Sequence, residues 1–372
     1  MKYFFLHLGL FSTLVLTAQN HSHTGDEAFQ YPDIEGYLTL KTDLHMHSVF
    51  SDGSVWPDIR VQEALMDGLD AIAITEHLEY QPHLADIPHP DRNRAIALAQ
   101  QEAKDHDLII IPGSEITRSA PVGHNNAIFI GDANELLQED ALQSFKTAKK
   151  QGAFVFWNHP AWYAQSPDGN PILRDFQKKR IAQNELHGIE VINFGAYAEE
   201  SLALALEYDL AILATSDVHG LIEWDYANKG LKRPLTLVFA EERSLNGMKE
   251  ALFARRTVAA YNELLIGKEA FLIPLIQAMV EIRDVSYINN TSILRLELSN
   301  NSSSDLILEN QMDYTFYESS PVVHLKAGQS KIIQVKTLET LKNLRLKFKV
   351  LSAYTAPKVH PKVVWDIAVD TP

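Results

Sequence analysis

Short apolar runs alternate with amphipathic stretches along the chain from about Gly36 to Tyr261. The amphipathic stretches, whose apolar residues recur at helical spacing, include 57–67, 91–106, 133–150, 171–184 and 198–207. The apolar runs read as strands and are 38–47, 71–77, 108–117, 126–130, 154–159, 188–194 and 211–219. Alternation of strands and helices at this spacing predicts an α/β fold with parallel strands.

The pattern changes beyond residue 282. Runs at 287–298, 305–308, 313–318, 330–338 and 344–351 alternate apolar and polar positions, as half-buried strands do. An Asn-Ser cluster at 299–304 and Gly328 supply turns. We therefore expect two domains, a barrel over 36–280 and a small β-sandwich over 281–372.

The N-terminus has the features of a secretory signal peptide. Lys2 precedes an apolar stretch at 4–17, and Ala18 ends a small-residue cleavage site. The stretch is too short for a membrane span, and the alternative is a buried N-terminal helix. We expect residues 1–18 to be a signal peptide and the mature protein to be exported, to the periplasm or beyond, without a membrane span.

The composition limits which partners and metal ligands the protein can have. The 372 residues carry a formal net charge of −15 and include no cysteine. Such an acidic chain lacks the basic footprint of a protein that tracks nucleic acid, so we expect no stable nucleic-acid complex. Any transition-metal site must use His, Asp and Glu. A small anionic substrate remains compatible with the charge, because bound cations reverse the local field. The sequence gives no indication of an oligomeric state.

Candidate metal ligands begin in the segment KTDLHMHSVFSDGS. Side chains at i and i+2 share one face of a strand, so we expect Asp43, His45 and His47 to point the same way, with Asp52 close by after a turn. For an isolated HxH motif, the alternative is two histidines that are hydrogen-bonded within the protein and bind no metal.

Further ionisable residues stand at the ends of the predicted strands. They are His77, Glu115, His124, His159, Asp217 and His219. A TIM-type barrel brings its strand ends together at the C-terminal face, where active sites are built. Taken singly, each of these residues is more typical of a capping or surface position, but together they favour one metal site.

The motifs DLHMHS-x-x-SDG, TEH, GSEI, GHNNA, NHP and SDVH, in this order, resemble those of the PHP (polymerase and histidinol phosphatase) superfamily. The resemblance covers about 38–261 and implies a distorted (β/α)7 TIM-like barrel with two or three divalent transition-metal ions, Mn, Zn or Fe. The signal peptide, the insert EYQPHLADIPHPDRNR and the trailing β-module resemble an exported phosphodiesterase branch of that superfamily.

The resemblance also implies a ligand set. A first ion would be held by His45, His47, Glu115 and Asp217. Glu115 would bridge to a second ion, bound also by His124 and His159, and a third ion would be held by Asp52, His77 and His219. Some members with three ions carry His where this chain has Asp52, and His124 lies in a loop-like context.

Other residues are candidates for substrate contacts. With Glu115 and Asp217, Arg118 is assigned a catalytic role, because it follows Glu115 by three residues and Arg binds phosphate through two donors; a surface ion pair is the alternative. The remaining candidates are His83, His89, Arg92 and Arg94 in a loop, Trp157, Trp162 and Tyr163 as an apolar wall, and Asn158 and Asn193. For the tryptophans, buried packing is the alternative.

We therefore expect an exported phosphodiesterase that acts on small organic phosphodiesters. Two adjacent metal ions lower the pKa of a shared water and polarise phosphoryl oxygens, so a metal-activated hydroxide would attack phosphorus. The PHP fold hosts several activities, and the alternatives are a phosphomonoesterase resembling histidinol phosphatase, a nucleotide-cleaving exonuclease, or a non-enzymatic binding module.

Overall fold

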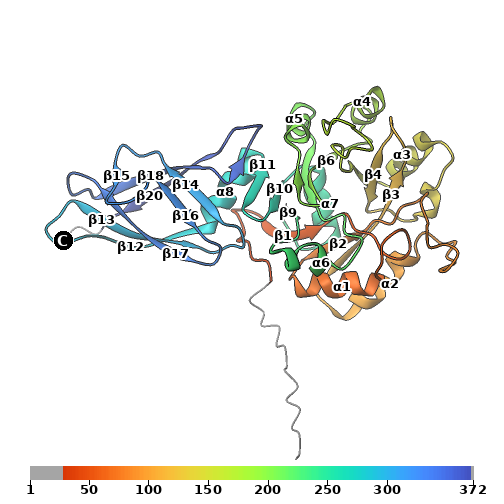
Figure 1. Ribbon diagram of the computed structural model, residues 1–372, viewed down its shortest axis with the longest axis horizontal. Coiled ribbons are helices and arrows are strands. Elements are labelled where there is room, and N and C mark those ends of the chain that lie inside the picture. Colours follow the sequence, from red (N-terminus) through yellow and green to blue (C-terminus); the bar gives the residue numbers. More distant parts are fainter. Residues whose placement is uncertain (1–27, 370–372) are drawn as a thin grey trace, which may run out of the picture.

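The protein has two lobes lying side by side, an α/β lobe and a C-terminal β lobe, in a computed structural model that describes residues 28–369 (Figure 1). The predicted signal peptide, 1–18, lies outside the described residues. Among the described residues, none of the helices is both long and apolar enough to cross a membrane.

The α/β lobe is built on a curled 12-stranded sheet (Figure 1). Its strands follow the order β19-β11-β10-β9-β1-β2-β3-β4-β5-β6-β7, and β8 pairs with β6. Their bounds are β1 (Leu38–Asp43), β2 (Ala71–Ile74), β3 (Ile109–Thr117), β4 (His124–Ile128), β5 (Phe154–Trp157), β6 (Gly188–Asn193), β7 (Ala196–Tyr197), β8 (Ala211–Thr215), β9 (Leu235–Ala240), β10 (Thr257–Tyr261), β11 (Leu264–Gly267) and β19 (Ala353–Tyr354).

The sheet is mixed, whereas the sequence pattern predicts an α/β fold with parallel strands. Strands β1, β2 and β3 are parallel, as are β5, β6 and β8, but β4 runs antiparallel to β3 and β5. β9 is antiparallel to β1 and β10. Antiparallel β4 starts where β3 ends, with His124 opposite Thr117, so its first residue reaches the same edge of the sheet as the C-terminal ends of its neighbours.

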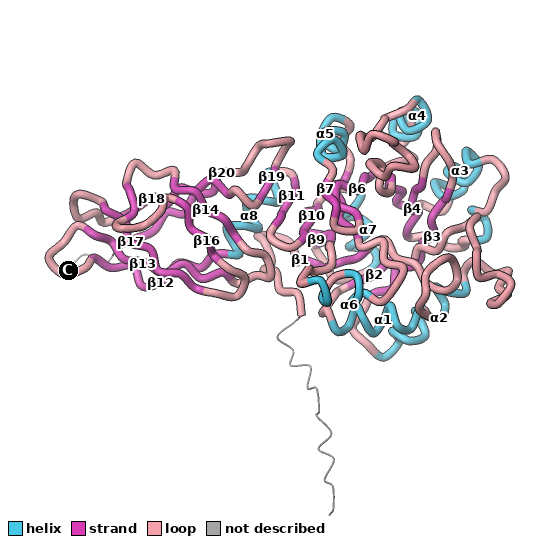
Figure 2. The backbone as a smooth tube through the Cα atoms, in the orientation of Figure 1, coloured by secondary structure: helices cyan, strands magenta, loops and turns pink. Residues whose placement is uncertain are grey.

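Helices cover the sheet and are α1 (Pro57–Met66), α2 (Arg94–Glu102), α3 (Ala141–Lys150), α4 (Asp175–Ala182), α5 (Glu199–Glu207), α6 (Ile222–Asp225), α7 (Leu245–Phe253) and α8 (Glu269–Met279) (Figure 2). Local sequence explains several starts. Pro57 opens α1, where a missing N–H costs nothing. The side chains of Asp140 and Ser244 accept backbone N–H groups at the starts of α3 and α7.

The β lobe consists of two four-stranded antiparallel sheets. One has the order β12 (Val280–Tyr287), β13 (Ile293–Asn300), β17 (Ser330–Lys336) and β15 (Thr315–Phe316). The other has the order β16 (Val322–Leu325), β14 (Leu306–Asn310), β18 (Asn343–Val350) and β20 (Lys362–Ala368). Alternate residues of β18 are buried, namely Leu344, Leu346, Phe348 and Val350. This alternation is what two sheets packed face to face require.

The two lobes share a sheet edge. After α8 leads the chain into the β lobe, strand β19 returns from that lobe and pairs in parallel with β11 of the curled sheet. Tyr354 of β19 stacks on Tyr197 of β7, with ring centroids 5.8 Å apart. The β lobe is therefore joined to the α/β lobe by backbone pairing as well as by side-chain packing.

Candidate metal centre

Nine ionisable side chains meet at one edge of the curled sheet, and we call them the histidine–carboxylate cluster: His45, His47, Asp52, His77, Glu115, His124, His159, Asp217 and His219. Several strands are shorter than predicted, because β1 ends at Asp43, β2 at Ile74, β5 at Trp157 and β8 at Thr215. The cluster residues next to these strands therefore lie in the loops that leave them. Asp43, expected to face the same way as His45 and His47, instead pairs with buried Arg233 and accepts the backbone N–H of Ser216.

Four ligand atoms form a compact group at the centre of the cluster. His45 Nε2 lies 3.0 Å from His47 Nε2, 3.2 Å from Glu115 Oε2 and 3.2 Å from Asp217 Oδ1. His47 Nε2 lies 3.4 Å from Glu115 Oε2 and 3.1 Å from Asp217 Oδ1. Four ligands around a tetrahedral metal at the usual zinc–nitrogen distance are about 3.4 Å apart. The separations among His45, His47 and Asp217 therefore suit one ion, and Glu115 Oε2 lies beside the two histidine nitrogens.

Glu115 faces two sides of the cluster. Its Oε2 belongs to the compact group, while its Oε1 lies 2.6 Å from His124 Nδ1. Both atoms are buried, and despite their proximity neither has a partner in hydrogen-bonding geometry. His159 stands next to His124, with ring centroids 5.0 Å apart. A carboxylate in this position can join two ions.

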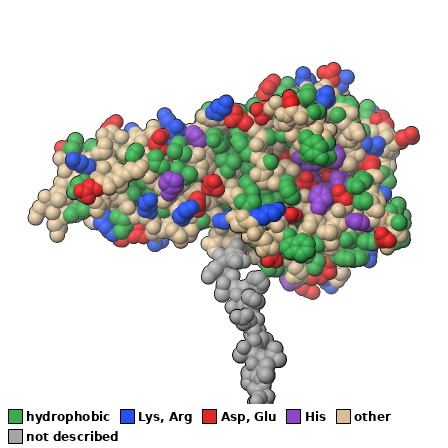
Figure 3. Space-filling model, viewed as in Figure 1, with side chains coloured by type: hydrophobic (Ala, Val, Ile, Leu, Met, Phe, Trp, Pro, Cys, Tyr) green, Lys and Arg blue, Asp and Glu red, His purple; other side chains and the backbone are tan. Residues whose placement is uncertain are grey.

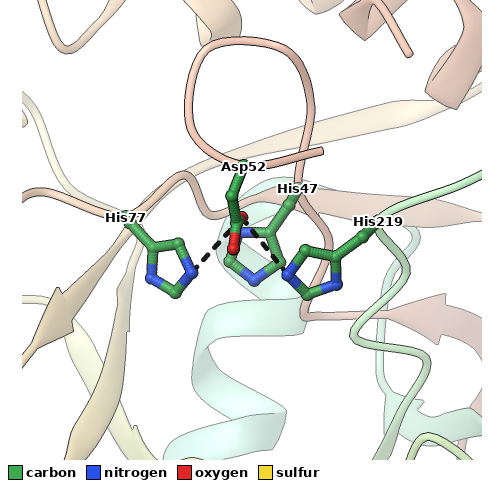
Figure 4. Close-up of side chains that lie close together, drawn as sticks. All are labelled: His47, Asp52, His77 and His219. Carbon is green, nitrogen blue, oxygen red and sulfur yellow. Dashed lines mark ion pairs between the residues drawn. The ribbon is translucent and has the colours of Figure 1, made fainter. Parts of the chain in front are cut away.

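Asp52, His77 and His219 form an outer group, and their side chains gather around His47 (Figure 4). Asp52 Oδ1 lies 3.4 Å from His77 Nε2 and 3.2 Å from His219 Nε2. It is buried without a hydrogen-bond partner, and His47 Nδ1 is 3.9 Å away. The rings of His77 and His219 each stack on His47 at 4.4 Å between centroids.

Hydrogen bonds at Nδ1 leave Nε2 free on four histidines. His45 Nδ1 donates to Glu190 Oε1 at 2.7 Å, and His219 Nδ1 donates to the carbonyl of Asp217 at 2.8 Å. His77 Nδ1 donates to Thr117 Oγ1, whose own proton goes to the Glu115 carbonyl.

His47 has the same arrangement, because its Nδ1 faces Ser51 Oγ, whose proton goes to Glu76. In all four rings Nε2 is thus left as the ligand atom, as outer partners of metal-binding histidines commonly arrange.

His159 differs from these four. The indole N–H of Trp157 donates to Gln165 Oε1, and Gln165 Nε2 donates to the carbonyl of Asn158. The amide is therefore oriented with its N–H toward His159 Nδ1, 3.0 Å away. His159 Nδ1 accepts in this arrangement, so a neutral His159 carries its proton on Nε2. An ion bound through that nitrogen must displace the proton.

The buried histidines and carboxylates of the cluster shift one another's pKa values. Burial opposes ionisation, but the carboxylates of Glu115 and Asp52 raise the pKa of His77 to about 11. Burial and the adjacent His77 lower the pKa of His47 to about 3. Despite burial, the neighbouring histidines hold the pKa values of Glu115 and Asp217 below the ordinary range. The carboxylates are therefore ionised and available to cations.

Two members of the cluster have backbone conformations that are uncommon for side-chain-bearing residues. His159 has φ 29° and Asp217 has φ 51°, both in the left-handed region. Hydrogen bonds hold them there, from His159 N to Glu190 Oε2 at 2.6 Å and from Asp217 N to the carbonyl of His45 at 2.9 Å. Such conformations concentrate at functional sites.

The cationic candidates for substrate contacts are engaged elsewhere or exposed. Arg118 Nε pairs with Glu79 at 2.8 Å, and its terminal nitrogens donate to the carbonyls of Gln138 and Glu139. Its role as a phosphate contact therefore remains a prediction. Arg92 donates to backbone carbonyls, and the two His89 ring nitrogens face backbone carbonyls. Arg94 is exposed and His83 is partly buried.

Aromatic side chains border the cluster. Figure 3 shows histidines at the surface of the α/β lobe with hydrophobic side chains around them. Trp162 is 39% exposed and its ring meets those of His124 and His159 at 5.4 and 5.2 Å. Tyr163 and Tyr80 are also exposed, and Tyr80 contacts the His77 ring edge-on. Trp157, expected in this wall, is instead buried.

Several residues that support the cluster have little or no signal in the sequence. Glu190, buried in β6, contacts His45 and the backbone of His159. A single Glu inside the apolar run GIEVIN was the available signal, because an unpaired buried carboxylate is rare. Asn193, a weak candidate, donates to Glu190 and lies 3.3 Å from Asp217 Oδ2. Asn158 orders β4 by exchanging hydrogen bonds with Asn126.

The donor set fits divalent transition metals. Imidazole nitrogens and carboxylate oxygens are ligands for Zn, Mn and Fe. The buried atoms without partners at Asp52, Glu115 and His124 point into the cluster. A cation there would satisfy them, and among the described residues no lysine or arginine forms an ion pair with a cluster carboxylate, although Arg60 Nε donates to the backbone carbonyl of His47.

Comparison with known proteins places the chain among relatives. A PHP domain model matches residues 43–155, and an Ig-like domain model matches 280–366. A solved two-domain protein from Bacteroides vulgatus, described as containing a predicted PHP-like metal-dependent phosphoesterase, is 40% identical, with a TM-score of 0.85 over 91% of this chain and 98% of that one.

Two curated proteins match over shorter stretches. An uncharacterised protein of Methanocaldococcus jannaschii is 33% identical over 84 residues, 22% of this chain. A protein-glutamate methylesterase/protein-glutamine glutaminase of Rhodopseudomonas palustris is 33% identical over 100 residues, 27% of this chain. The chain spans 36% and 24% of the length of these two relatives.

Proposed function

Since the chain belongs to the PHP-like metal-dependent phosphoesterases, we propose that it is an exported enzyme that hydrolyses small organic phosphodiesters. The convergence of nine imidazole and carboxylate side chains at one sheet edge carries this proposal. When bound there, divalent ions supply Lewis acidity toward a phosphoryl oxygen and lower the pKa of a coordinated water.

The ligand assignment that we propose has two or three ions. His45, His47 and Asp217 hold the first ion with Glu115, which also holds the second with His124 and His159. Asp52, His77 and His219 hold the third. Zn, Mn and Fe all suit these donors.

A diester is favoured over a monoester by the surroundings of the cluster. Arg118 and Arg92, which could balance the second charge of a monoester, donate to protein acceptors instead. Exposed Trp162, Tyr163 and Tyr80 offer ring faces to an ester arm. A monoanionic phosphate with an apolar arm matches this combination better than a dianion does.

The test compares kcat/KM for a nitrophenyl-type diester with that for its monoester at equal metal loading, using Mn and Zn in turn. We expect the diester to be preferred, and chelator-treated protein is the control. A monoester preference of about tenfold, roughly 1.4 kcal/mol of transition-state binding, would favour the phosphomonoesterase alternative.

Export is part of the same proposal and rests on the signal-like residues 1–18. Fractionation of cells that produce the full chain, with sequencing of the mature N-terminus, tests it. Protein that stays in the cytoplasm with residues 1–18 attached would contradict export without affecting the proposed chemistry.

A further inference from the structure

Glu190 is a buried carboxylate of β6 whose two oxygens are both fully engaged. Oε1 accepts from His45 Nδ1 at 2.7 Å and from Thr215 Oγ1 at 2.6 Å. Oε2 accepts from the backbone N–H of His159 at 2.6 Å and from Asn193 Nδ2 at 2.9 Å. One side chain, 1% exposed, thus ties together four separate points around the cluster.

The contact with His45 fixes a ring whose orientation decides the compact group. With Nδ1–H donated to Glu190, His45 Nε2 is directed at His47 Nε2, Glu115 Oε2 and Asp217 Oδ1. The carboxylate also makes the imidazole a better donor to a cation, since it draws on the shared proton.

The contact with His159 acts through the backbone instead. His159 lies in the left-handed region, at φ 29°, where a residue with a side chain is held only by its surroundings. Its N–H donates to Glu190 Oε2. Asn193, which shares this oxygen, also reaches within 3.3 Å of Asp217 Oδ2.

We propose that Glu190 is a positioning residue that sets the affinity of the two inner ions without binding either. It contacts His45, on the side of the first ion, and the backbone of His159, on the side of the second. Within the described part of the chain, the outer residues Asp52, His77 and His219 make no hydrogen bond or ion pair with it. The inference rests on the proposed metal centre and adds that Glu190 supports its two inner ions and not the outer one.

The test measures Zn²⁺ affinity by competition with a chelator and the number of ions per chain by elemental analysis. The proteins are wild type, Glu190→Gln, Asp52→Ala and the double variant. Glu190→Gln should bind the inner ions roughly ten- to hundredfold more weakly, the usual cost of an outer partner. In Glu190→Gln, the ion that depends on Asp52 should keep its wild-type affinity. The double variant should show both defects, namely weaker binding of the inner ions and loss of the ion that depends on Asp52.

Glu185→Gln is the matched control. Glu185 is a buried glutamate that pairs with Arg180 at 2.9 Å and touches no member of the cluster. This change should lower the thermal midpoint and leave Zn²⁺ affinity unchanged, which separates positioning from general stability. Thr215→Val, which removes one of the four donors to Glu190, should weaken the inner ions by a few-fold and decides the matter if Glu190→Gln does not fold.

The outcomes separate the two hypotheses. Wild-type protein that binds no Zn²⁺ would overturn the proposed metal centre and the role of Glu190 with it. Wild-type protein that binds two or three ions, with unchanged inner affinity in Glu190→Gln or, if that variant is unfolded, in Thr215→Val, would overturn only the role of Glu190. Equal weakening of the Asp52-dependent ion would also overturn it.

Discussion

The inner and outer parts of the cluster differ in how they are held. His45, His47 and Glu115 are at most 1% exposed and are surrounded by the ends of strands. In the outer group His77 is buried, but the side chains of Asp52 and His219 are 23% and 39% exposed. Side chains enclosed on all sides are preorganised for an ion, whereas more exposed side chains must be ordered when the ion binds.

This difference predicts unequal consequences of losing a ligand. The inner group should hold its ions through assay and purification and should determine the rate of the chemical step. The outer ion should exchange more readily. Three substitutions, at Glu115, Asp52 and Gln165, test this difference, and a fourth, at Trp162, tests the surface beside the inner group.

Glu115→Gln should have the largest effect, because Glu115 Oε2 lies within 3.4 Å of three cluster histidines and Oε1 lies 2.6 Å from His124. An amide cannot serve both sides as an anion does. We expect kcat/KM for a diester to fall by more than the roughly hundredfold that loss of an outer partner can cost, with a lower metal content.

Glu79→Gln is the matched control for this experiment. Glu79 is a nearby glutamate that pairs with Arg118 and lies outside the cluster. The Glu79→Gln protein should retain its metal ions. Near-native activity of Glu115→Gln in the presence of saturating metal would contradict a bridging role.

Asp52→Ala should be milder, since Asp52 reaches only the outer group and the edge of His47. We expect one ion fewer per chain by elemental analysis and a partial loss of kcat. The order of the two variants is the critical observation. Inactive Asp52→Ala beside active Glu115→Gln would reverse the assignment of the ions.

The ends of the strands explain how much of this site the sequence predicts. The ligands were identifiable because ionisable residues follow buried apolar runs, and those runs end at one edge of a sheet. The sequence does not indicate the exact ends of β1 and β8, because His47 and Val218 continue the apolar and polar pattern beyond the last residue of each strand. The reversed direction of β4 was also hidden, since alternation does not encode strand direction.

Partners that act at a distance were harder to predict. Glu190 is 145 residues from His45 in sequence, and Gln165 lies in a loop without a motif. Arg118 shows the opposite case. Its residue type and position suggest a phosphate contact, but its side chain pairs with Glu79 and donates to two backbone carbonyls. No local sequence pattern predicts these partners.

Trp162→Ala tests the surface next to the inner group and not the ions themselves. Its ring contacts His124 and His159 and is partly exposed, so an aryl arm can stack on it. An aromatic pair contributes about 0.5–1.5 kcal/mol, so KM for an aryl diester should rise roughly two- to tenfold.

Trp162→Phe, which keeps a ring, should lie between the two proteins, and a small alkyl diester serves as the substrate control. Equal losses for aryl and alkyl diesters, with fewer bound ions, would indicate that Trp162 supports the ligands instead of the substrate.

Gln165→Glu should have the smallest effect, and it tests why His159 differs from the other inner histidines. The present amide donates to His159 Nδ1, while His45 donates its Nδ1 proton to a carboxylate. A carboxylate of the same shape at 165 would accept from His159 Nδ1, still accept from Trp157, and move the ring proton away from Nε2. We expect Zn²⁺ to bind the inner group more tightly in the Asp52→Ala background, by up to about tenfold, as measured by chelator competition. Unchanged or weaker binding would mean that His159 does not bind an ion through Nε2, and the second ion would then depend on Glu115 and His124.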